Sequence, residues 1–292
     1  MTSRPATLAV VIPTKDAAHL LRDCLASVAW ADEIIVVDMF STDDTAVVCA
    51  GYPQCRLIQR EDYIFANVNH GFDQATSDWV MRLDTDERLT PELAIEVQEI
   101  LADPPAGVTG YEFRERRFAL AHELLHGAGH EHHRKMMFRR GTARYPVRHE
   151  HEDLETSGTW LRSRHAYVHY AYATVADYLT KTNYYTERDV ERAPLPERPP
   201  STTRAVLESL RAFYLYMLKL RAYKDGWIGV LDGGMRAYYQ FTLWMKLRER
   251  WERERGGLPV TSSGAAASAR PERHAHAPDD RPHGGPRPGA SA

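Results

Sequence analysis

Two short segments carry residue types and spacings that could support chemistry, one acidic and one rich in histidine. The acidic segment, Asp84-Thr85-Asp86, follows an apolar run, so both carboxylates would emerge on one side at the end of a strand. Paired carboxylates in that position suit a hard cation, Mg²⁺ or Mn²⁺, that keeps open positions for phosphate oxygens. Such an ion neutralises the charge that builds up on a departing diphosphate. The acidic segment therefore predicts a metal site formed by Asp84 and Asp86.

The histidine-rich segment HELLHGAGHEH, residues 122–132, fits a zinc-protease pattern. In that interpretation His122, His126 and His132 would hold zinc and Glu123 would act as general base. The local abundance of histidine makes an accidental match easier. A zinc metalloprotease is one function that this segment would allow.

The elements that would position the acidic segment alternate regularly. Short β-branched runs at 8–12 and 34–37 flank a helical pattern at 17–29, as in a strand–helix–strand unit. Further strands are expected at 56–59 and 79–84, and further helices at 42–50, 66–76 and 91–101. This alternation predicts an α/β fold with an open parallel sheet. Because ligands bind at the carboxyl ends of such strands, Thr14, Asp38, Asp84 and Asp86 should meet in one cleft.

The rest of the chain is expected to form other elements. Strands are predicted near 110–120 and 136–141, and a tyrosine-rich helix over 165–192. The predicted organisation is a catalytic domain over 1–192, a proline-rich linker over 193–203, amphipathic helices over 204–255 and a disordered tail over 256–292.

Three segments of the first half resemble family 2 glycosyltransferases in order and spacing. They are VVIPTKD at 10–16, IIVVDMFSTDDT at 34–45 and ANVNHGFDQATSDWVMRLDTDE at 66–87. The resemblance implies a GT-A fold, a Rossmann-like nucleotide-binding sheet here followed by a C-terminal helical appendage, and a nucleotide-sugar donor. It implies a set of nucleotide-binding residues: Pro13, Thr14, Asp38, Asp43 and Asp84. Asp86 would bind the metal, with Asp84 facing ribose or metal, and Asp43 could also cap the following helix.

RYPVRHEHEDLETSG at 144–158 resembles the HE motif of a bacterial subgroup that includes lipopolysaccharide core glucosyltransferases. The resemblance implies that Glu152, beside His151, is the base that deprotonates the acceptor hydroxyl in an inverting transfer. Glu150, beside His149, is the alternative register. MMFRRG at 136–141 is similar to another element of this subgroup, in which Arg139 or Arg140 could reach the donor phosphates. The implied reaction transfers a hexose from a UDP-sugar to a cell-envelope glycan such as lipopolysaccharide core. The alternatives are the zinc metalloprotease and a non-catalytic protein that binds sugar nucleotides.

The composition limits the cellular location and the binding partners that we expect. The 292 residues carry a formal charge of −3, which argues against a nucleic-acid binder, and three unpaired-looking cysteines favour a reducing compartment. No apolar run approaches the roughly 18 residues that span a bilayer. Residues 204–255 combine many aromatic residues with eleven Lys and Arg against six Asp and Glu, which suits an anionic membrane surface or a homo-oligomer. We therefore expect a cytoplasmic enzyme, peripheral on the inner face of the membrane and acting on a glycolipid acceptor.

Overall fold

The computed structural model describes residues 4–127, 132–147 and 153–255. Most of the strands between Leu8 and Tyr172 form one mixed β-sheet. Its strands are β1 (Leu8–Thr14), β2 (Glu33–Asp38), β3 (Cys55–Gln59), β4 (Trp79–Arg82), β5 (Glu87–Leu89), β6 (Val108–Ala119), β7 (His122–Leu124), β8 (His133–Arg139) and β11 (Thr159–Tyr172). A separate pair is formed by β9 (Ala143–Arg144) and β10 (Glu155–Thr156).

The helices before residue 105 are α1 (Ala18–Ser27), α2 (Thr45–Ala50), α3 (Ile64–Gln74) and α4 (Pro91–Ala102). Those after residue 172 are α5 (Val175–Arg192), α6 (Thr202–Tyr214) and α7 (Gly226–Arg255). A π-helical turn, η2 (Leu215–Lys219), and a 3₁₀ turn, η3 (Ala222–Asp225), join α6 to α7.

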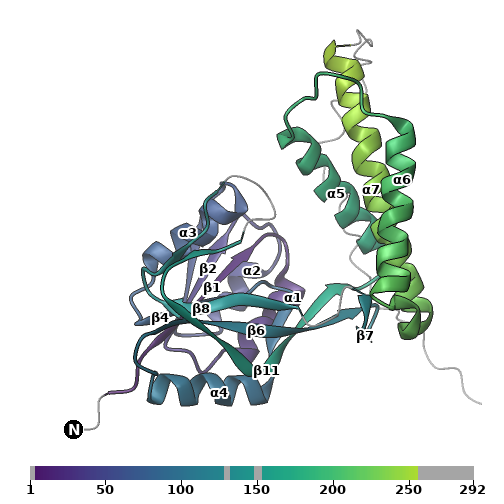
Figure 1. Cartoon of the computed structure of the whole chain (residues 1–292). Helices are drawn as coiled ribbons and strands as arrows, with labels where there is room; N and C mark the ends of the chain where they lie inside the picture. Colours follow the sequence, from purple (N-terminus) through teal and green to yellow (C-terminus); the bar gives the residue numbers. More distant parts are fainter. Residues whose placement is uncertain (1–3, 128–131, 148–152, 256–292) are drawn as a thin grey trace, which may run out of the picture. The chain divides into compact units, whose positions relative to one another are not determined.

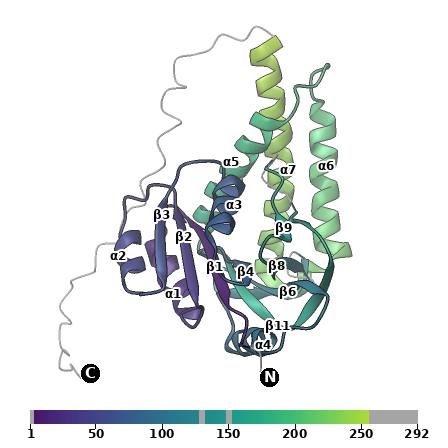
Figure 2. The ribbon, with the colours of Figure 1, turned by 90° about the vertical axis from the view of Figure 1, so that its left-hand side faces the viewer.

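The strand order is β3-β2-β1-β4-β8-β6-β11-β5, with β7 paired to β6 (Figures 1 and 2). The first four strands are parallel, as predicted, and the antiparallel strand β8 joins them to the second half of the sheet. Every residue of β1 is buried, because helices cover both of its faces. Side chains of α1, α2 and α4 pack in one apolar cluster with the sheet, and α3 packs in a second cluster.

One expected element is different in the structure. Residues 165–172, predicted to begin a helix, belong to β11, and the helix α5 begins only at Val175. The strand runs parallel to β6 and antiparallel to β5. Ala166 and Tyr167 are buried there because both neighbouring strands supply hydrogen bonds and apolar contacts that the sequence alone does not show.

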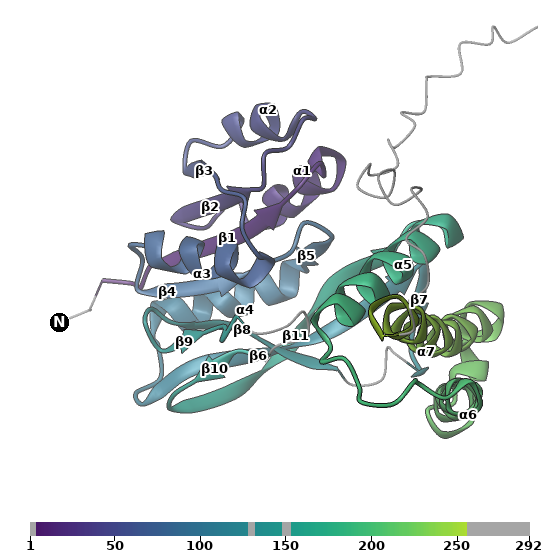
Figure 3. The ribbon, with the colours of Figure 1, turned by 90° about the horizontal axis from the view of Figure 1, so that it is seen from above.

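The helices after β11 contact one another through polar side chains. Tyr178 of α5 donates a hydrogen bond to Asp232 of α7 at 2.7 Å, and Lys246 of α7 forms an ion pair with Glu187 of α5 at 2.8 Å. Figure 3 views α6 and α7 nearly along their axes. Contacts divide the chain after Trp251, and the described part of the second unit is the last turn of α7. Within the described residues, no helix is both long and apolar enough to span a bilayer.

Candidate active site

The carboxyl ends of β1, β2 and β4 lie at one edge of the sheet because the three strands are parallel. Thr14 pairs in register with Asp38, and the chain leaves β4 beside β1 through a hydrogen bond from Leu83 N to Val11 O at 3.1 Å. Thr14 is 2% exposed, and its Oγ1 has no hydrogen-bond partner among the described residues. A buried hydroxyl without a partner at a strand end is a group that a ligand could satisfy.

The turn after β2 is held by its own acidic side chains. Asp38 accepts hydrogen bonds from the backbone and hydroxyl of Ser41. Asp43 accepts from Ala18 N at 2.8 Å and from the Thr45 hydroxyl at 2.6 Å. Burial works to raise the pKa of Asp43, but these hydrogen bonds outweigh it and lower the value. Asp43 therefore ties the starts of α1 and α2 together, although the N-cap residue of α2 is Asp44 and not Asp43.

Asp84 is clamped by two arginines. Arg82 Nε lies 3.0 Å from Oδ1, and Arg134 Nη1 lies 3.3 Å from Oδ2. Arg134 also reaches the fully buried Glu87 at 2.6 Å. Burial would raise the pKa of Asp84, but the two guanidinium groups keep it below its usual value. Both oxygens of Asp84 are therefore already engaged by cations.

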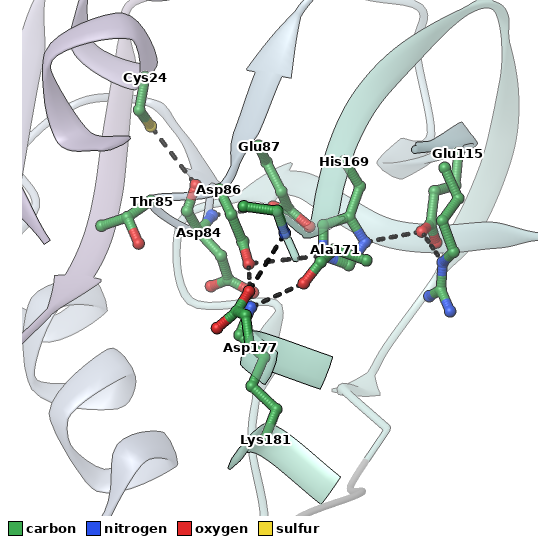
Figure 4. Close-up of polar contacts among 12 residues, drawn as sticks. Cys24, Asp84, Thr85, Asp86, Glu87, Glu115, His169, Ala171, Asp177 and Lys181 are labelled. Carbon is green, nitrogen blue, oxygen red and sulfur yellow. Dashed lines mark hydrogen bonds and ion pairs between the residues drawn. The ribbon is translucent and has the colours of Figure 1, made fainter. Parts of the chain in front are cut away.

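Asp86 faces a different set of partners (Figure 4). Its Oδ2 lies 3.4 Å from Nζ of Lys181, which comes from α5, and 3.7 Å from Nε2 of His169, which comes from β11. Burial opposes the charge of Asp86, yet His169 and Lys181 keep its pKa well below the ordinary range. The backbone amide of Tyr170 donates to Asp86 O at 2.8 Å and fixes β11 against this loop.

A third carboxylate orients His169. Its Nδ1 lies 2.7 Å from Oε1 of Glu115 on β6, so its Nε2 is directed toward Asp86. Burial favours the neutral imidazole, but the hydrogen bonds with Asp86 and Glu115 outweigh it and raise the pKa of His169 to about 9. A carboxylate behind a histidine is the usual support for a metal-binding imidazole.

Asp86 and His169 carry the ligand types that a divalent cation would use, provided that His169 gives up the proton that its raised pKa favours. A carboxylate oxygen and a supported imidazole nitrogen face each other there, both common metal ligands. Within the described residues, no group of three or more His, Cys, Asp and Glu side chains could hold a metal ion, so these residues would supply two ligands. Two protein ligands leave the remaining coordination positions for phosphate oxygens and water, as Mg²⁺ and Mn²⁺ sites require.

Sequence reasoning missed His169, Lys181, Glu115 and Arg134. They come from β6, β8, β11 and α5, elements that lie far from Asp86 in the chain. One signal was present for His169: the run HAYVHYAY mixes aromatic, alanine and valine residues in a way that also suits a strand.

The two arginines expected near the donor phosphates lie elsewhere. Arg139 is in register with Trp79 at the start of β4, the opposite end of that strand from Asp84. Its Nε donates to Val108 O at 2.9 Å, and Arg140 Nε donates to Ser77 O at 2.9 Å. The β8 arginine that contacts Asp84 is Arg134, at the other end of this strand. The expected base Glu152 and its neighbours Glu150 and His151 lie outside the described residues.

The zinc-protease interpretation of 122–132 is wrong. That pattern needs a helix that presents two histidines on one face, whereas His122 to Leu124 form the strand β7. Glu123, the would-be base, pairs with Arg116 at 2.8 Å. His126 binds Asp225 at 2.7 Å and His132 binds Glu115 at 2.8 Å, so these histidines serve separate structural contacts.

Comparison with known proteins identifies the family of the chain. The family model described as Glycosyl transferase family 2 matches residues 9–169. An uncharacterized glycosyltransferase of Rickettsia felis is 23% identical over 259 residues, covering 82% of this chain and 89% of that protein. The lipopolysaccharide core biosynthesis glycosyltransferase LpsC of Rhizobium meliloti is 22% identical over 249 residues, covering 83% of this chain and 92% of that protein.

Among solved structures, S. aureus TarS in complex with UDP-GlcNAc aligns with a TM-score of 0.41 at 16% identity, covering 87% of this chain and 93% of that one. The family model spans more than half of the chain, and the α/β sheet with helices on both faces agrees with the GT-A fold predicted from the resemblance. The chain belongs to glycosyl transferase family 2.

Proposed function

We propose that this glycosyltransferase transfers a hexose from a UDP-sugar to a cell-envelope glycolipid, such as lipopolysaccharide core, with inversion and with the help of Mg²⁺ or Mn²⁺. The observation that carries this proposal is the line of Asp86, His169 and Glu115 at the carboxyl end of the parallel strands. Asp86 and His169 would hold the metal, and Glu115 would keep the imidazole oriented. The bound ion would neutralise negative charge on the leaving diphosphate.

The donor nucleoside would lie at the ends of β1 and β2. The unpartnered Thr14 hydroxyl supports this location, beside Pro13 and the turn that Asp38 and Asp43 hold in place. Because Arg82 and Arg134 already bind both oxygens of Asp84, we assign Asp84 to the ribose side of the donor rather than to the metal.

Lys181 supplies a positive charge beside Asp86, in the position to contact a donor phosphate. The proton of the acceptor hydroxyl would pass to a carboxylate on the opposite side of the sugar. We assign this role to Glu152, with Glu150 as the alternative and His151 as its neighbour. This assignment rests on the sequence motif.

An anionic membrane surface is the proposed setting, and helix α6 supports it. Its outward side is apolar over a continuous face, formed by Val206, Leu207, Leu210, Phe213 and Tyr214, each at least 39% exposed. The buried Ala205 lies on the opposite side, so the most apolar face of this amphipathic helix points away from the rest of the unit. Arg204 and Arg211 flank the apolar face, and basic residues beside an apolar face suit anionic lipid headgroups.

The test is calorimetric titration of UDP, GDP and dTDP, with and without Mn²⁺, into the full chain. We expect one nucleotide to bind with a strong dependence on metal. Asp86→Ala and His169→Ala should abolish that dependence, while Asp103→Ala, an exposed aspartate after α4, should leave it intact. The proposal fails if no nucleotide binds the wild-type chain, or if binding is the same with and without metal. Binding without any sugar turnover would instead support the non-catalytic alternative.

A further inference from the structure

A hollow shares Glu115 with the candidate active site, since Glu115 is one of its lining residues and also contacts His169. It has a volume of about 490 Å³ and is lined by β6, β7 and the segment from η2 to η3. Its walls carry five basic side chains and two carboxylates: Arg114, Arg116, His126, Lys219 and Arg221, with Glu115 and Glu123. The volume is within the range of about 300–1,000 Å³ that is typical of small-molecule sites.

Both carboxylates in this pocket are already neutralised. Glu123 pairs with Arg116 at 2.8 Å. Glu115 is shared among Arg117 at 2.7 Å, His132 at 2.8 Å and His169 at 2.7 Å.

Three of the basic side chains form no close ion pair within the part of the chain that the structure describes, although Arg114 is near enough to Glu123 to help lower the pKa of that carboxyl. Arg114, Lys219 and Arg221 make no ion pair there, and all three are exposed. Three unpaired positive charges around one hollow create a field that attracts anions.

The pocket is built by fixed contacts. His126 meets Asp225 through both its backbone N at 2.8 Å and its Nδ1 at 2.7 Å. Gly127 N donates to Leu220 O at 2.9 Å, which ties the end of β7 to the η2–η3 segment. These contacts fix the backbone on either side of the hollow, including the segment that carries Lys219 and Arg221, and preorganisation of a site favours affinity.

The pocket lies next to the proposed metal side of the active site. Glu115 lines the pocket and also orients His169, so one side chain separates the hollow from the metal-facing imidazole. Lys219 ends the π-helical turn η2, which follows α6 along the chain, and Arg221 precedes η3.

We propose that this pocket binds a phosphate group carried by the acceptor. This inference rests on the proposed function, because it assumes a glycolipid acceptor. Two guanidinium groups and an ammonium group offer planar, paired donors and a point charge, the combination that phosphate oxygens accept best. Holding the phosphate here would orient the acceptor sugar toward the Asp86 side of the site.

The experiment uses glucose 6-phosphate as the probe, with glucose as its uncharged counterpart, titrated into the full chain saturated with UDP and Mn²⁺. We expect glucose 6-phosphate to bind and glucose to bind at least ~10-fold more weakly, since charge-assisted hydrogen bonds dominate. In the variant Arg114→Gln, Lys219→Gln, Arg221→Asn, affinity for glucose 6-phosphate should fall at least ~10-fold. Asparagine is chosen because Arg221 has φ of 58°, which Asn tolerates.

The matched control is Arg4→Gln, Arg22→Gln, Arg198→Gln, which removes the same charge from three exposed sites that do not line the pocket. Equal affinity in the two triple variants, or no phosphate-dependent binding to the wild type, overturns the inference. If the pocket variant binds phosphatidylglycerol vesicles more weakly but keeps its affinity for glucose 6-phosphate, the inference is overturned, because the pocket then binds a lipid headgroup and not a phosphate group of the acceptor. UDP binding is measured first: if it is absent, the proposed function fails, and if it is present, the pocket is tested independently.

Discussion

His169 and Glu115 are joined side chain to side chain, with Nδ1 of the imidazole 2.7 Å from Oε1 of the carboxylate. The hydrogen bond fixes which ring nitrogen faces Asp86. The two residues sit on parallel neighbouring strands, where His169 pairs in register with Arg117, two residues after Glu115. The sheet itself therefore sets the orientation of the proposed metal ligand.

Replacing Glu115 with glutamine should weaken metal binding without removing a ligand. Loss of a carboxylate behind a metal-binding histidine typically lowers metal affinity by about 10–100-fold. The measurement is a Mn²⁺ titration in the presence of UDP, followed by electron paramagnetic resonance. Glu112→Gln is the control, since Glu112 is on the same strand but pairs with the exposed Arg162. Unchanged Mn²⁺ affinity in Glu115→Gln would show that Glu115 does not position the ligand.

Arg134→Met should destabilise the fold and disturb the donor side together. Arg134 bridges Asp84 and the fully buried Glu87, and removing one partner of a buried ion cluster leaves uncompensated charge, at a cost of about 3 kcal/mol. The free energy of unfolding in urea measures this cost. Arg162→Met removes an arginine whose pair with Glu112 is largely exposed, and it should change stability little. Similar losses in both variants would contradict the bridging role of Arg134.

The first hundred residues followed the sequence prediction closely because each element there carries its own signal. Buried parallel strands are continuous apolar runs, and the helices between them keep a regular apolar spacing. The elements of the second half were predicted less well from the sequence. The β11 segment is stabilised by β5 and β6, which lie far away in the sequence, and no local pattern encodes those pairings. The same reason hid His169, since its role depends on Glu115 and Asp86 meeting across the sheet.

Gly71→Ala should destabilise the contact between α3 and the sheet. An added Cβ would lie 2.4 Å from Val11 Cγ1 and 3.1 Å from Val37 Cγ2, so the helix would have to shift away from β1 and β2. Overpacking of this kind costs about 1–3 kcal/mol and should lower the melting temperature.

Gly234→Ala provides the opposite case. Gly234 lies within α7, and an added Cβ there would meet no atom within 4 Å. Because alanine favours the helix over glycine by roughly 0.5–1 kcal/mol, this variant should be slightly more stable than the wild type. A destabilised Gly234→Ala with an unaffected Gly71→Ala would refute the packing assigned to α3.

Leu207→Ser combined with Leu210→Ser should weaken binding to vesicles containing phosphatidylglycerol. Each leucine buries an apolar side chain worth about 1.5 kcal/mol or more, so the pair should lower the partition coefficient at least ~100-fold. Sedimentation with vesicles measures this. Val47→Ser combined with Ile95→Ser changes two equally exposed apolar residues on α2 and α4 and should have little effect. If the α6 variant instead changes only the molecular mass in solution, the apolar face joins two copies of the chain.

The place of β11 between β6 and β5 also has a consequence for biosynthesis. A nascent chain that ends before Thr159 contains Asp84, Asp86 and Glu115 but lacks His169, and the facing edges of β5 and β6 are open. Open strand edges invite pairing with other chains. The glycosyltransferase therefore cannot assemble the proposed cation site during synthesis until its fourteen-residue strand β11 has left the ribosome. Chaperone protection should matter most in the interval between synthesis of β6 and closure of the sheet by β11.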